Sequence, residues 1–280
     1  MTSPLSPIPR HVANLWSLVD YKPGGAESTL EQKLEAVKAA GFDGFTTNAG
    51  KEHARLAAQF DLLVVGFFST SKVDEMEDLL RSNRDAGAKS INVQLADHDT
   101  PVEESVRAAI RLNELADKLG VTASVEVHRD TCTETPEKTY AIAEGYRRET
   151  GKLLTFTWDF SHLSVVKHLA PPYWERLLVD PQLVQQAEQF HFRPFNGHHC
   201  QVPVTDGKGG LSLEITQWIP FLEKALEMWV AGNQAGREVI LVPEMGPVDG
   251  GYNFAQLPNS WEDAIVLRRI IAEAWTKALG

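Results

Sequence analysis

Residues 121–128 read Val-Thr-Ala-Ser-Val-Glu-Val-His, an alternation of apolar and polar side chains. Successive side chains of a β-strand point to opposite faces of the sheet, so this period of two predicts a strand with one apolar and one polar face. Gly120 comes directly before it, and a helical pattern with Leu112, Ala116 and Leu119 on one face comes before the glycine. Glycine favours the left-handed position that ends a helix, so the segment is predicted to be helix, turn and strand.

The same unit recurs along the chain. Eight segments rich in β-branched and aromatic residues are expected as strands: 12–19, 44–48, 62–69, 90–96, 122–128, 154–159, 189–195 and 238–245. Eight βα units match a TIM barrel, and an open doubly wound sheet is the alternative. The alternative normally carries a glycine-rich G-x-G-x-x-G phosphate loop, which this sequence lacks. We therefore predict an α/β fold, a single-domain (β/α)8 TIM barrel over residues 11–280, after an N-terminal extension of residues 1–10.

Composition narrows the class of function. The 280 residues contain 27 Lys and Arg against 38 Asp and Glu, a net charge of −11, which disfavours nucleic acid as a partner. The longest apolar runs fall far short of the roughly 20 residues that cross a bilayer, so no membrane span is expected. Two cysteines make neither a disulfide scaffold nor a thiolate zinc site. A cytoplasmic protein is the expectation, and a homo-oligomer is compatible with the sequence.

Four consecutive strand candidates end in chemically useful side chains: Glu126, Asp159, His191 and Glu244. The first three lie on the polar side of their strands. Glu244 shares its side with Ile240 and Val242, which are acceptable fillers of the barrel interior. Active sites of TIM barrels lie at the carboxyl ends of the strands, so all four are expected at one rim.

The chemistry of this set is specific. Three carboxylates that converge without a cation repel one another, whereas a divalent ion makes their oxygens and one imidazole a favourable shell. The sequence therefore predicts one divalent metal ion bound by Glu126, Asp159, His191 and Glu244.

Other side chains near this rim are weaker candidates. His128, His162 and Arg193 are candidate substrate contacts, although Arg193 could equally form an ion pair with a rim carboxylate. Asn92, Gln94 and His98 share one side of their strand and could hydrogen-bond a polyol, although a simple rim network is the safer expectation. Trp16 and Phe68 are candidate apolar walls of a pocket, although core packing is the commoner fate of such rings.

Four motifs carry a family resemblance: Val-Glu-Val-His-Arg-Asp at 125–130, Trp-Asp-Phe-Ser-His at 158–162, Phe-His-Phe-Arg at 190–193 and Pro-Glu-Met-Gly at 243–246. The chain resembles the xylose-isomerase-like TIM barrel superfamily, and within it the sugar phosphate isomerase/epimerase group. The resemblance implies Glu126, Asp159, His191 and Glu244 as ligands of Mn, Mg, Co or Zn, with His162 and Arg193 on substrate oxygens. By similarity to the ketose 3-epimerases, Glu126 and Glu244 would also act as acid and base.

The function implied by this resemblance is a divalent-metal-dependent isomerase or epimerase. Its small-molecule substrate would be a sugar or sugar-like hydroxy-ketone, and the reaction would pass through a metal-stabilised enediolate. A metal-dependent lyase or dehydratase of a keto-sugar or cyclitol is the alternative; an endonuclease IV-like nuclease and a non-catalytic binding barrel are less favoured. The epimerases usually carry another glutamate shortly after the first, where this chain has His-Arg-Asp-Thr at 128–131, so the substrate stays open.

Overall fold

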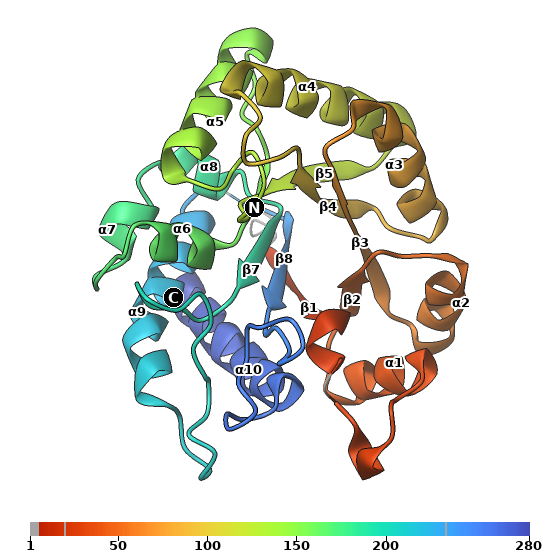
Figure 1. Cartoon of the computed structure of the whole chain (residues 1–280), viewed down its shortest axis with the longest axis vertical. Coiled ribbons are helices and arrows are strands. Elements are labelled where there is room, and N and C mark those ends of the chain that lie inside the picture. Colours follow the sequence, from red (N-terminus) through yellow and green to blue (C-terminus); the bar gives the residue numbers. More distant parts are fainter. Residues whose placement is uncertain (1–5, 20, 233) are drawn as a thin grey trace, which may run out of the picture.

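A computed structural model describes residues 6–19, 21–232 and 234–280. Its strands form a closed, parallel barrel in which each strand pairs with the next and β8 pairs with β1 (Figure 1). The strands are β1 (Ile8–Asn14), β2 (Gly44–Thr47), β3 (Leu63–Thr70), β4 (Ser90–Leu95), β5 (Thr122–Glu126), β6 (Phe156–Trp158), β7 (Gln189–Phe192) and β8 (Glu238–Pro243). The predicted (β/α)8 barrel is confirmed.

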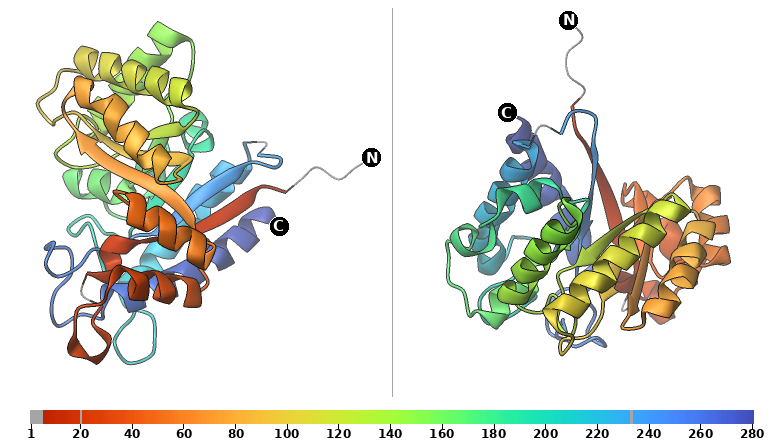
Figure 2. Two further views of the ribbon diagram at one scale, coloured as in Figure 1. Left: turned by 90° about the vertical axis from the view of Figure 1, so that its right-hand side faces the viewer. Right: turned by 90° about the horizontal axis from the view of Figure 1, so that it is seen from above.

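Helices cover the outside of this barrel (Figure 2). They are α1 (Leu30–Ala39), α2 (Lys51–Phe60), α3 (Met76–Asp85), α4 (Val102–Leu119), α5 (Pro136–Thr150), α6 (Phe160–Val166), α7 (Trp174–Leu177), α8 (Pro181–Gln185), α9 (Leu213–Val230) and α10 (Ser260–Leu279). Short 3-10 helices occupy Leu15–Leu18, Pro23–Gly25 and Val73–Glu75. Thr29 and Gln32 form a capping box at the start of α1, and Gly120 ends α4 at a φ of 70°.

The apolar core has two parts. A large cluster joins the strands to the helices and includes Phe156, Trp158 and Leu222. A small, separate cluster of Val12, Val65 and Val242, with Ile240 against it, contains side chains of β1, β3 and β8. Ile240 and Val242 thus fill the barrel interior, as expected, on the same side of β8 as Glu244. Glu244 lies beyond them, directly after the end of the strand.

Two predicted boundaries at the N-terminus are wrong. The strand expected at 12–19 is Ile8–Asn14, because Ile8 already pairs with Glu238 of β8 and the Asn14 side chain accepts a hydrogen bond from the Trp16 backbone N–H, starting a 3-10 turn. Residues 8–10 therefore belong to the barrel and not to the predicted extension 1–10, whose first five residues lie outside the described residues.

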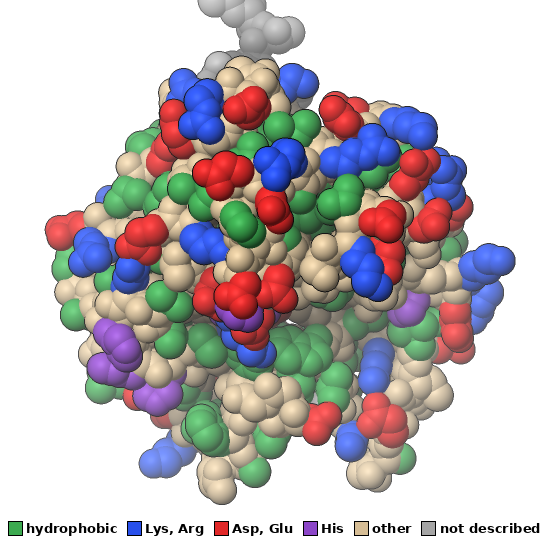
Figure 3. All heavy atoms as spheres, turned by 45° about the horizontal axis from the view of Figure 1, so that its top comes forward, with side chains coloured by type: hydrophobic (Ala, Val, Ile, Leu, Met, Phe, Trp, Pro, Cys, Tyr) green, Lys and Arg blue, Asp and Glu red, His purple; other side chains and the backbone are tan. Residues whose placement is uncertain are grey.

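The surface mixes charges of both signs. On the face drawn in Figure 3, acidic and basic side chains are interspersed among hydrophobic ones, and the face is hollowed near its centre. Within the described ranges, we find no helix with the combination of length and apolar character that a bilayer span requires.

Candidate active site

Three of the four predicted ligands converge in the structure. Glu126 ends β5, His191 lies in β7 and Glu244 directly follows β8. Oε1 of Glu126 and Oε2 of Glu244 each lie 3.0 Å from Nδ1 of His191. One ligand atom from each residue lies within 4.8 Å of the others, and all three side chains are buried. We call Glu126, His191 and Glu244 the rim triad.

The charges of the rim triad are strongly coupled. Burial by itself lowers the pKa of His191, but Glu244 and Glu126 outweigh this and raise it to about 10. Burial likewise raises the pKa of Glu126, but His191 outweighs burial and brings it down to about 2. Two carboxylates thus face one ring nitrogen, which can carry only one proton. The other ring nitrogen of His191, Nε2, is buried without a hydrogen-bond partner among the described residues.

Asp159 lies beside the triad and is held by other partners. Its Oδ1 accepts hydrogen bonds from the backbone and hydroxyl of Ser161 at 3.0 and 2.6 Å. Its Oδ2 lies 3.1 Å from Nη2 of Arg193 and 3.3 Å from Nε2 of His162. Burial raises the pKa of Asp159, but the Arg193 cation, His162 and the Ser161 hydroxyl together outweigh burial and hold this pKa well below its usual range. Its role as a fourth ligand stays a prediction.

Arg193 connects Asp159 to the triad. The same Nη2 atom lies 3.1 Å from Oε2 of Glu244, so one guanidinium nitrogen bridges two carboxylates. Arg193 is only 2% exposed, and its Nε and Nη1 have no hydrogen-bond partner within the described part of the chain. The ion pair considered for Arg193 is therefore present, and two of its donor nitrogens are still free for a ligand.

A cavity of about 620 Å³ opens over the rim triad. Its lining comes from seven of the eight strands or the loops after them. It includes Asn14, Trp16, Thr46, Asn92, Gln94, His128, Arg129, Arg193 and Tyr252. Such a volume is typical of small-molecule sites. His128 lines the cavity, whereas His162 and Asp159 do not belong to its lining. The His162 ring packs against the His128 ring, with the ring centres 4.2 Å apart and the planes tilted by 58°.

Aromatic side chains of the cavity wall pack against the Arg193 guanidinium. The Tyr252 ring centre lies 4.3 Å from the guanidinium, and Trp16 meets Tyr252 edge-on at 5.0 Å. Nε of Arg129 donates to the Tyr252 hydroxyl at 2.8 Å, which ties the loop after β5 to the loop after β8.

Some site residues differ from expectation. Trp16 lines the cavity as predicted, but Phe68 packs in the main core and its neighbour Phe67 lines the cavity instead. Sequence reasoning missed Asn14, because the first strand was extended past it and hid its place at a strand end. It also missed Tyr252, which lies in the long loop between β8 and α10, where no periodicity marks a residue.

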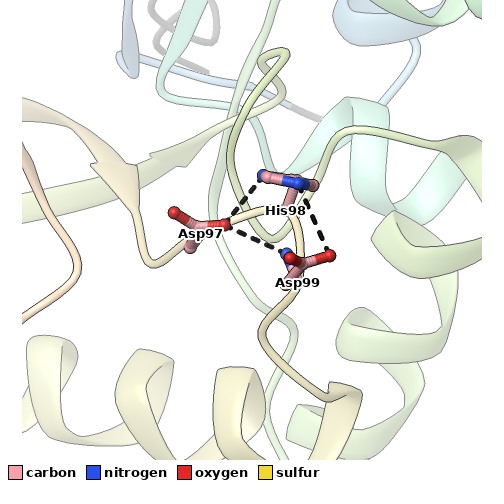
Figure 4. Close-up of side chains that lie close together, drawn as sticks. All are labelled: Asp97, His98 and Asp99. Carbon is pink, nitrogen blue, oxygen red and sulfur yellow. Dashed lines mark hydrogen bonds and ion pairs between the residues drawn. The ribbon is translucent and has the colours of Figure 1, made fainter.

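A second group of potential ligands lies after β4, at Asp97, His98 and Asp99 (Figure 4). Nδ1 of His98 is 2.8 Å from Asp97 and its Nε2 is 3.4 Å from Asp99, so the loop pairs with itself. All three residues are exposed. Exposed acidic groups of this kind are common without a bound ion, and none of the three lines the cavity.

No protein-family model and no curated protein matches the sequence. Solved structures do match over nearly the whole chain. An L-ribulose 3-epimerase is 15% identical with a TM-score of 0.61, covering 98% of this chain and 96% of the other. A xylose isomerase-like TIM barrel protein from Mycobacterium smegmatis, in complex with magnesium, is 15% identical with a TM-score of 0.57 and 98% of each chain covered.

A sugar phosphate isomerase/epimerase from Parabacteroides distasonis is 12% identical with a TM-score of 0.56, covering 100% of this chain and 97% of the other. At such low identity the likeness establishes the fold. The resemblance seen in the motifs is confirmed at that level, and the chain has the fold of the xylose isomerase-like TIM barrels.

Proposed function

We propose that this protein is a divalent-metal-dependent isomerase or epimerase of a sugar or sugar-like hydroxy-ketone. The observation that carries the proposal is the rim triad, three buried ligand groups at the wall of a cavity of small-molecule size. The structural neighbours support the same class, since they include an epimerase of a sugar and a barrel in complex with magnesium.

The donor set fits a divalent ion. Glu126 and Glu244 direct one oxygen each at a histidine nitrogen that can satisfy only one of them, so the group has an excess of acceptors. Carboxylate oxygens with one imidazole suit Mg²⁺, Mn²⁺, Co²⁺ or Zn²⁺. Asp159, whose Oδ2 shares the Arg193 guanidinium with Glu244, would supply a further ligand oxygen.

A bound divalent ion would draw electron density from two neighbouring oxygens of a hydroxy-ketone and so acidify the C–H bond between them. The rest of the chemistry falls to side chains of this chain. Glu126 and Glu244 both line the cavity, and a carboxylate within reach of the substrate carbon can accept that proton. Return of the proton to the opposite face epimerises the carbon, and return to the adjacent carbon isomerises the sugar.

Arg193 and His128 would bind and orient the substrate in this scheme. The Nε and Nη1 groups of Arg193 are unpaired donors among the described residues, and a guanidinium can bind substrate oxygens but cannot ligate a cation. His128 lines the cavity, and burial lowers its pKa, which favours the neutral ring that can donate or accept a hydrogen bond.

Metal content and isotope exchange test the proposal. Protein purified without chelator should contain one divalent ion per chain, and Glu244→Ala and Asp159→Ala should lose it. The matched control is Asp99→Ala, which removes a ligand from the exposed group and should keep the metal. Full metal content in Asp159→Ala would remove Asp159 from the shell, and loss of metal in Asp99→Ala would move the site to the loop after β4.

Catalysis is tested on a panel of ketoses and polyols. Solvent deuterium should enter the substrate carbon during turnover, and Glu126→Gln and Glu244→Gln should lower kcat by about 10²- to 10⁴-fold, because an amide cannot take up the proton. Turnover without deuterium incorporation, or near-wild-type rates in both variants, would contradict the acid–base roles.

A further inference from the structure

Two asparagine side chains of the cavity wall donate hydrogen bonds to the glutamates of the rim triad. Nδ2 of Asn92 donates to Oε2 of Glu126 at 2.8 Å, and Nδ2 of Asn14 donates to Oε1 of Glu244 at 3.0 Å. In each case the other oxygen of the glutamate is the one that lies 3.0 Å from His191. Each carboxylate therefore has one oxygen on an amide and one at the centre of the triad.

The two contacts are built alike. Asn92 lies on β4, the neighbour of the strand that carries Glu126, and Asn14 lies on β1, the neighbour of β8. Each amide thus comes from the adjacent strand of the barrel and meets the glutamate oxygen that does not face His191.

The direction of these amides follows from their surroundings. The backbone N–H of Trp16 donates to Oδ1 of Asn14 at 3.0 Å, so the oxygen of this amide is occupied and its nitrogen must face Glu244. Asn92 is fully buried, and a flipped amide would put Oδ1 against a carboxylate oxygen, which is repulsive.

From this geometry we infer that Asn14 and Asn92 are positioning residues that keep Glu244 and Glu126 as monodentate ligands of the metal. The inference rests on the proposed function. A carboxylate can give a cation one oxygen or two, and ions such as Mg²⁺ and Mn²⁺ take about six ligand atoms. A glutamate that used both oxygens would fill a position that a substrate oxygen needs. An amide donor on the oxygen that does not face His191 disfavours that arrangement.

The number of exchangeable waters on bound Mn²⁺ tests this inference directly, without turnover. Water-proton relaxation should give the same number for the wild type and for the control Gln94→Leu. Gln94 is also an amide on β4 that lines the cavity, but it donates to neither glutamate among the hydrogen bonds described. Asn14→Leu and Asn92→Leu, which keep the side-chain shape but not the donor, should each lose at least one water, and Mn²⁺ affinity should fall roughly ten- to a hundredfold.

A second substitution distinguishes the loss of the amide donor from misfolding. Asn14→Ser keeps an oxygen for the Trp16 N–H, since serine is a good cap, while it removes the amide that faces Glu244. It should lose a water as Asn14→Leu does. If the asparagine variants bind Mn²⁺ with the wild-type number of waters, the inference is wrong and the proposed function stands. If the wild type binds no Mn²⁺, the proposed function fails and the inference falls with it.

Discussion

Replacing Arg193 by leucine should destabilise the metal-free protein strongly. Its Nη2 lies 3.1 Å from Asp159 and 3.1 Å from Glu244 in a fully buried site. At an effective dielectric constant of about 20, each contact amounts to roughly 5 kcal/mol of Coulomb attraction, and the desolvation of the three groups offsets a large part of it. Leaving two buried carboxylates without their cation typically costs about 3 to 5 kcal/mol, a large share of the stability of most domains.

The assay is urea unfolding followed by circular dichroism, in EDTA and again with Mn²⁺. Arg193→Leu should lose about 3 to 5 kcal/mol of unfolding free energy in EDTA. Saturating Mn²⁺ should recover part of this, because an ion present at 100 times its Kd stabilises the folded state by about 2.7 kcal/mol. Arg193→Lys keeps the charge but not the planar group over Tyr252, so it should lie between the wild type and Arg193→Leu.

A loss below about 1 kcal/mol in EDTA would refute the reasoning, since it would mean that the two carboxylates do not depend on the guanidinium. The same variant distinguishes a substrate-binding role of Arg193 from a role in holding the metal. Arg193→Leu should retain bound metal while kcat/KM falls by about 10²-fold, because a substrate contact is lost and no ligand is. Loss of the metal from a folded variant would place Arg193 in direct support of the shell.

Two further outcomes are expected. His162→Ala should keep its metal and lower kcat/KM by about 10²-fold, because His162 contacts Asp159 and packs against His128; elemental analysis and kinetics check this, and metal loss would contradict it. Burial lowers the pKa of His11 from 6.5 to about 4, so the unfolded chain binds this proton first and stability falls as the pH drops from about 6.5 to 4. Between those values the wild type should lose up to about 3 kcal/mol more than His11→Leu in urea unfolding with EDTA, and equal losses would contradict the shift.

The fold could be predicted because its signal is repeated. Each βα unit carries its own alternation, helix face and end signal, so an error at one strand leaves the count of eight intact. The boundaries were less accurate, as β1 shows: a run of apolar residues after Asn14 looks like a continued strand, while the structure makes Leu15–Leu18 a 3-10 helix. The capping hydrogen bond that stops the strand has no counterpart in hydrophobic periodicity.

The site could be predicted only in part, and for a related reason. The alternation of side chains along a strand predicts that Glu126 and His191 meet at one rim, because both lie in regular strands. It could not show that the Asp159 carboxylate is shared with Arg193 and His162, since those partners are set by side-chain rotation across the rim. For Asn92 the sequence favours a rim network over a polyol contact, but identifying Glu126 as its partner needs the register between two strands.

The balance of charge links the rim triad to Asp159 and Arg193. Glu126, Asp159 and Glu244 carry three negative charges in a buried space, and among the described residues within ion-pair distance of them Arg193 is the one permanent cation. In the metal-free protein, protonation of His191 offsets one of the two remaining negative charges, and its raised pKa reflects that demand. A divalent ion would offset both and leave the imidazole neutral, in the form that ligates metals. Arg193 and a bound ion would therefore offset the same excess of negative charge, so the loss of Arg193 should be most severe when the metal is removed.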